Sequence, residues 1–121
     1  MNAINDYIEC ALWSSTDDAC NPLDKNYGPD DIAPETRARM ERDWYLFCLR
    51  ADGLIVDANL MRGQCSAETQ AAHDFWLTRN GHGAGFWDGD WEKSAGEKLT
   101  ALAKKFGGMD LYVGDDGKIH C

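Results

Sequence analysis

The sequence predicts an α+β fold, with about four helices packed on a small antiparallel sheet that includes a C-terminal β-hairpin. Three observations predict this class. Apolar residues recur at helical spacing in several segments, turn-forming residues separate those segments, and apolar residues alternate near the C-terminus. The chain has 121 residues, of which 44% are hydrophobic, so a single domain spanning residues 1–121 is expected.

Three helices are expected in the first two thirds of the chain. The first covers residues 3–14, and the second begins near Pro34, which suits the first helical position, and runs to about Ala51. Ser66 is a suitable N-cap for a third helix over residues 67–79. Core-facing stripes are expected to contain Ile4, Tyr7, Ile8, Ala11, Leu12, Met40, Trp44, Phe47, Ala71, Ala72, Phe75 and Trp76.

A fourth helix and a hairpin complete the predicted fold. Ser94 and Glu97 form a capping-box pattern, the apolar residues that follow keep helical spacing, and Gly107-Gly108 supplies the stop. A hairpin over about 109–120 turns at residues 115–117. Since a lone hairpin is marginal in water, the hairpin is expected either to pack against the helices or to gain a third strand, for which residues 54–56 and 86–87 are the candidates.

Negative charge is concentrated in the first half of the chain. The net charge is −9, with −6 in residues 1–62 and −3 in residues 63–121, and an acidic loop is expected over about 15–33. No basic stripe is present, so direct binding of nucleic acid through phosphates is disfavoured. A basic protein surface is the favoured partner, although an acidic exterior also serves solubility alone.

The most unusual segment is a glycine- and aromatic-rich loop over about 80–91. It does not fit a phosphate-binding loop, because a helix precedes it, and a calcium loop fails because Lys93 and Leu99 stand where glycine and glutamate are needed. Either the loop packs on itself or it binds a partner. Trp87 and Trp91 among acidic residues have the make-up of a protein-binding hot spot, unless both close over the core.

No catalytic residue, metal site or cofactor is predicted. The five cysteines are widely spaced with no Cys-x-x-Cys pair, and the histidines His73, His82 and His120 lack ligand spacing. Cys48 is expected to be buried and inert. Cys65 is the best candidate for a reactive thiol, because a helix N-terminus lowers a thiol pKa. With no signal peptide and no membrane span expected, a cytoplasmic location is favoured.

Two stretches carry a resemblance. The words FWLTRNGHGAGFWD at residues 75–88 and LYVGDDGKI at residues 111–119 resemble a set of small acidic proteins encoded by bacteriophages, prophages and plasmids. The resemblance implies a phage or mobile-element context, in the cytoplasm of a host bacterial cell, and it transfers no activity. Small acidic proteins from that context are often inhibitors of host defence, including anti-CRISPR and anti-restriction proteins, and some imitate nucleic acid.

The leading functional hypothesis is therefore a non-enzymatic inhibitor that binds a host defence complex through an acidic surface and blocks nucleic-acid binding. A small-molecule binder or enzyme using His82, Asp88 and Asp90 is the alternative, and a phage structural or accessory protein is a third. The predicted partner-binding residues are Asp17, Asp18, Asp24, Asp30, Asp31, Trp87, Asp88, Asp90 and Trp91.

Overall fold

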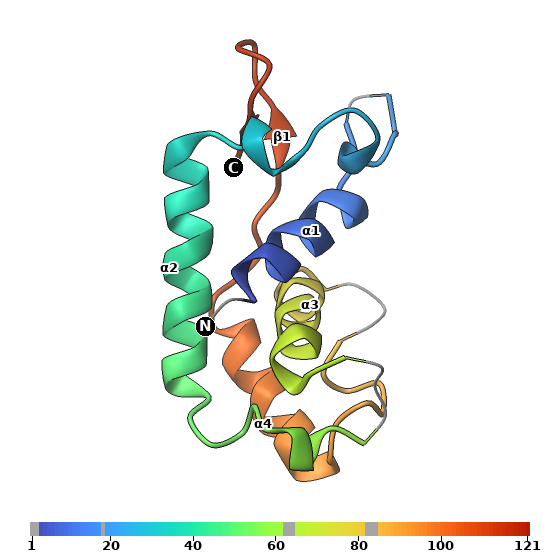
Figure 1. Cartoon of the computed structure of the whole chain (residues 1–121), viewed down its shortest axis with the longest axis vertical. Helices are drawn as coiled ribbons and strands as arrows, with labels where there is room; N and C mark the ends of the chain where they lie inside the picture. The colour runs from blue at the N-terminus through green and yellow to red at the C-terminus, as the bar shows by residue number, and fades with distance from the viewer. Residues whose placement is uncertain (1–2, 18, 62–64, 82–84) are drawn as a thin grey trace.

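The computed structural model describes residues 3–17, 19–61, 65–81 and 85–121, and it confirms the α+β class (Figure 1). Within these residues there are four α-helices and one two-stranded antiparallel sheet. The helices are α1 (Ile4–Ser14), α2 (Pro34–Arg50), α3 (Ala67–Arg79) and α4 (Lys93–Lys104), the strands are β1 (Tyr112–Val113) and β2 (Ile119–His120), and short 3-10 turns cover Leu23–Lys25, Pro29–Asp31 and Asp57–Asn59.

The helix starts follow the local chemistry, with one correction. Pro34 opens α2, and the Ser66 hydroxyl caps α3 by accepting the Thr69 N–H at 3.2 Å. The capping box expected at Ser94 is wrong. Glu92 is the N-cap of α4, and its carboxylate accepts the Ala95 N–H at 2.9 Å. The backbone N–H groups of Ala95 and Ser94 hold the pKa of Glu92 below its usual range.

The hairpin forms as expected, but its neighbour is a different segment. Tyr112 pairs with His120 and Val113 with Ile119. Neither segment expected to supply a third strand does so, because residues 54–56 and 86–87 form turns and bends. Instead the extended chain before α2 lies beside β2, where the Ala33 N–H donates to the Ile119 carbonyl at 2.9 Å.

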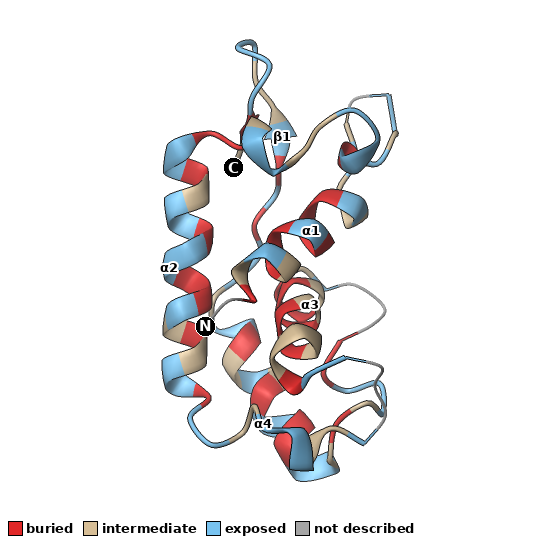
Figure 2. Cartoon of the chain, in the orientation of Figure 1, coloured by how far each residue is buried: buried red, intermediate tan, exposed pale blue. Residues whose placement is uncertain are grey.

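An aromatic cluster forms the centre of the core. Phe47 of α2 stacks on Phe75 of α3 with ring centroids 4.2 Å apart, and Tyr7 of α1 lies 5.4 Å from Phe75. Trp44 and Trp76 are buried, as expected from their helical positions. The buried sides of α1, α2 and α3 therefore face one another, and the outer side of α2 is exposed along one edge of the molecule (Figure 2).

One buried arginine joins the helices. The Arg79 Nη1 donates to the Tyr7 hydroxyl and to Asp43 Oδ2, both at 3.0 Å, and its Nε donates to the Gly107 carbonyl at 2.9 Å. Arg79 thus connects α1, α2 and the segment after α4. Removing one member would leave a buried charge unpaired, which typically costs about 3–5 kcal/mol. These groups are hydrogen-bonded to one another within the fold.

Candidate interaction surfaces

The acidic loop is ordered by two of its own carboxylates. Asp17 Oδ1 accepts the N–H groups of Ala19 and Asn21 at 2.9 and 3.0 Å, and Asp31 Oδ2 accepts the Gly28 N–H at 2.8 Å. Both are half-buried. Asp24 and Asp30 are exposed and form no salt bridge within the described residues, and Asp18 lies outside them. Two of the predicted acids therefore shape the loop and two present their charge to solvent.

The fold brings a second acidic segment to the same place. Because residues 32–33 lie beside β2, the acidic loop and the hairpin share the upper end of the molecule in Figure 1. Residues 15–33 and 109–121 together contain eight acidic and two basic residues, a balance of −6 out of −9. We call these two segments the acidic end. Its hairpin acids, Asp110, Asp115 and Asp116, are absent from the predicted site residues, although the Asp115-Asp116 pair was a visible signal.

At the hairpin, one carboxylate is held by local partners. Asp116 lies 3.1 Å from His120 Nε2, and its Oδ1 accepts the Lys118 N–H at 2.9 Å. The Lys118 N–H, followed by His120, holds the pKa of Asp116 below its usual range. Asp116 therefore stays ionised in the turn. Asp110 and Asp115 are exposed.

The glycine- and aromatic-rich loop divides its two tryptophans between solvent and core. Trp87 is 47% exposed, whereas Trp91 is 4% exposed, so the expectation that Trp91 belongs to a surface hot spot is wrong. Met61 N–H donates to the Asp90 carbonyl and Glu92 N–H to the Asn59 carbonyl, both at 2.7 Å. This pairing with residues 59–61 holds the backbone on both sides of Trp91, whose side chain lies in the core. Trp87 borders a hollow of about 440 Å³ beside the start of α4.

One predicted acid of this loop binds the loop's own backbone. Asp88 is exposed, but its Oδ2 accepts the Gly85 N–H at 3.3 Å, and Asp90 is half-buried. His82, which the enzyme hypothesis needs, lies outside the described residues. In Figure 1 the 85–92 segment lies near α4, away from the acidic end. Trp87 and Asp88 therefore belong to a different surface from Asp24 and Asp30.

A buried carboxyl outside the predicted partner-binding residues lies behind this loop. Asp74 of α3 is 2% exposed, and its Oδ2 accepts the Trp91 Nε1–H at 2.8 Å and the Gln70 amide at 3.1 Å. Burial, the largest cause, raises the pKa of Asp74 to about 6, and Asp88 and Asp90 add to the rise. The hydrogen bond from Trp91 ties the loop to α3 through Asp74, and Asp74 lines neither the hollow beside α4 nor one that lies between α1 and α2.

Three cysteines have thiol pKa values raised by their surroundings. Burial raises the pKa of Cys10 and of Cys48 to about 12. Cys48 is nevertheless only half-buried, so the expectation that it is fully buried is wrong. Cys65 is exposed before α3, but desolvation and then the nearby carboxylates of Asp6, Asp74 and Asp90 raise its pKa, so the expected lowering by the helix dipole is wrong. Within the described ranges, no group of three or more His, Cys, Asp or Glu side chains is arranged to hold a metal ion.

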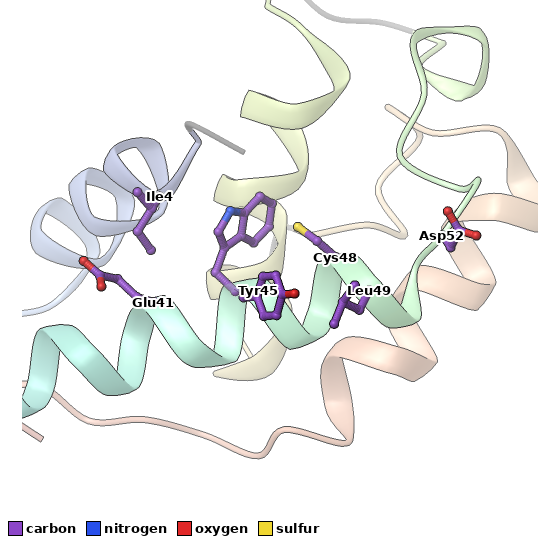
Figure 3. A pocket seen from close by; sticks show the side chains of 7 residues that line it. Ile4, Glu41, Tyr45, Cys48, Leu49 and Asp52 are labelled. Atoms are coloured by element: carbon purple, nitrogen blue, oxygen red, sulfur yellow. The ribbon is translucent and has the colours of Figure 1, made fainter.

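An apolar hollow of about 680 Å³ lies between α1 and α2 (Figure 3). Ile4 borders it from α1, and Tyr45, Cys48 and Leu49 border it from α2, with Asp52 just beyond the end of the helix. Trp44 and Glu41 complete the lining. Tyr45 and Leu49 lie outside the core-facing stripe of α2, so the helical spacing of the apolar residues did not indicate this surface.

Neither a membrane-spanning helix among the described residues nor a known relative points to a function for this chain. Among the described residues, no helix is both long and apolar enough to cross a membrane. Comparison of the chain with family models, with curated proteins and with solved structures finds no match.

Proposed function

We propose that the protein is a non-enzymatic binding protein whose acidic end occupies the basic, nucleic-acid-binding surface of a host protein complex. The finer form of the proposal, an inhibitor of a host defence complex from a phage or mobile element, rests on the resemblance of residues 75–88 and 111–119. The observation that carries the proposal is the meeting of two acidic segments at one end of the fold.

The arrangement of charge supports this choice of partner. Asp24, Asp30 and Asp115 are exposed without salt bridges in the described part of the chain, so their fields reach solvent. Asp17 and Asp31 order the loop that carries two of these acids, which lowers the entropy lost on binding. A fixed array of carboxylates repels phosphates and attracts lysine and arginine, the side chains that line nucleic-acid-binding surfaces.

Affinity capture with charge-reversed variants tests the proposal. The tagged chain is used to capture proteins from a bacterial lysate at about 0.1 M salt and again at about 1 M, where the Debye length falls from about 10 Å to about 3 Å. We expect a nucleic-acid-handling complex to be captured at low salt and released at high salt. Asp24→Lys/Asp30→Lys should weaken its binding at least about tenfold.

The matched control changes the net charge equally at other places. Glu9→Lys/Glu97→Lys replaces exposed acids outside the acidic end and should leave binding within about threefold of the unmodified chain. Equal losses in the two variants would show that only the total charge matters. That result, or capture indifferent to salt, would overturn the role of the acidic end.

A further inference from the structure

The outer face of α2 and the turn that follows it carry a stripe of four exposed residues. Arg42, Tyr45, Leu49 and Asp52 follow one another at intervals of three, four and three, the spacing of a seam between paired helices. The Arg42 side chain is 65% exposed, Tyr45 is 62% exposed and Leu49 is 56% exposed. Asp52 is exposed as well. This outer side of α2 is the pale edge of the molecule in Figure 2.

The stripe adjoins the hollow between α1 and α2. Three members of the stripe, Tyr45, Leu49 and Asp52, also line this hollow (Figure 3). Two large apolar side chains beside an apolar hollow form a continuous surface whose burial would be favourable by roughly 25 cal/mol per Å² of apolar area. Such a surface, bounded by charges at its two ends, has the make-up of an interface.

We propose that this stripe pairs with the same stripe of a second copy of the chain, with the two α2 helices antiparallel about a twofold axis. An axis at the level of residue 47 brings Arg42 opposite Asp52 of the second copy and Tyr45 opposite its Leu49, and symmetry repeats both pairs. The order of the stripe, basic, apolar, apolar and acidic, is therefore complementary to itself when reversed. That property selects a second copy as the occupant.

Other arrangements of the same helices are disfavoured by charge. Parallel pairing places Arg42 beside Arg42 and Asp52 beside Asp52. A shift of the axis by half a residue brings Asp52 opposite Glu41, which already pairs with Arg37 at 2.9 Å. Like charges in contact oppose association. The antiparallel register centred on residue 47 avoids both conflicts.

The two charged groups are available for the contact. Arg42 lies 3.5 Å from Asp43 Oδ1, a long contact, and the other carboxylate oxygen of Asp43 is occupied by Arg79 at 3.0 Å. Asp52 forms no salt bridge among the residues that the structure describes. Pairing across the axis would satisfy Arg42 and Asp52 without breaking the buried pair.

Sedimentation of the purified chain over a range of concentrations tests the proposal, and charge exchange makes the test specific. The unmodified chain should dimerise reversibly. Arg42→Glu alone and Asp52→Arg alone should each weaken the dimer at least about tenfold, because each creates two like-charge contacts. An equimolar mixture of these two variants should recover the dimer, since both cross-axis pairs then join opposite charges. The double variant Arg42→Glu/Asp52→Arg should recover it too.

Arg39→Glu is the matched control on the same helix, because Arg39 is exposed outside the stripe and should leave dimerisation unchanged. Circular dichroism confirms that each variant is folded. A chain that stays monomeric up to about 1 mM, a limit of about −4 kcal/mol of binding, overturns the proposal. A dimer that the single variants leave intact also overturns the proposal. The same holds if the chain stays monomeric and binds an amphipathic helix instead. Since only the purified chain is used, the outcome is independent of the acidic end.

Discussion

The acidic end and the glycine- and aromatic-rich loop look alike in the sequence, yet the fold uses them in opposite ways. Both combine turn residues with several carboxylates. In the acidic end, Asp17 and Asp31 bind backbone N–H groups so that their neighbours Asp24 and Asp30 remain exposed. In the loop, the chain turns inward and buries Trp91. Turn residues and carboxylates in a sequence can therefore belong either to an exposed surface or to a segment that closes over the core.

The largest expected effect tests whether the loop belongs to the core. Trp91→Ala removes a buried side chain and leaves Asp74 without its indole donor, so the free energy of unfolding should fall by about 3–5 kcal/mol. Trp87→Ala is the comparison within the same loop, because Trp87 is 47% exposed, and it should cost less than about 1 kcal/mol. Urea unfolding measures both, and equal losses would erase the distinction between the two tryptophans.

A smaller effect concerns pH. The pKa of Asp74 is raised to about 6, above its usual value near 3.8, so the folded chain holds this proton more tightly than the unfolded chain. The resulting stabilisation is complete below the usual pKa and is lost as the pH rises through about 6. Between pH 4 and 7 the unmodified chain should therefore lose on the order of 2 kcal/mol relative to Asp74→Asn.

Unfolding measured across that pH range checks the Asp74 prediction. Asp110→Asn, at an exposed acid, should keep the pH profile of the unmodified chain. If Asp74→Asn also keeps that profile, the carboxyl titrates normally and the loop is not closed over it.

The smallest effect separates the two kinds of acid in the acidic end. Asp31→Ala removes the acceptor of the Gly28 N–H and should cost about 1 kcal/mol, as loss of a capping side chain does. Asp30→Ala should change stability by no more than about 0.5 kcal/mol. Thermal unfolding compares them, and a similar cost for Asp30→Ala would mean that this carboxylate is also committed to the fold.

Much of the fold was predictable because it depends on local chemistry. The apolar spacing and Pro34 define α2, Ser66 defines the start of α3, and the glycine at 117 defines the hairpin turn with its φ of +76°. The start of α4 was not predictable in this way, because the side chains of Glu92 and Ser94 can both accept a backbone N–H. In the structure the cap is Glu92, which follows the bridge between Trp91 and Leu60.

The long-range part of the candidate surfaces lay beyond sequence reasoning. No local pattern indicates that residues 32–33 lie beside β2, so the union of two acidic segments could not be foreseen. The burial of Trp91 likewise depends on pairing with a distant segment. The stripe on α2 was visible as spacing, but its exposure became informative only once the opposite face of the helix was known to fill the core.

The distribution of tryptophan gives the molecule a built-in optical probe of its surfaces. Trp44, Trp76 and Trp91 are at most 4% exposed, while Trp13, at the end of α1 that leads into residues 15–33, is 48% exposed and Trp87 is 47% exposed. A neutral quencher such as acrylamide should therefore quench the fluorescence of Trp13 and Trp87 far more than that of the three buried tryptophans. Replacing either one by phenylalanine leaves a single accessible emitter, so shielding of that emitter by a ligand would report, without any attached dye, which part of the exterior has been covered.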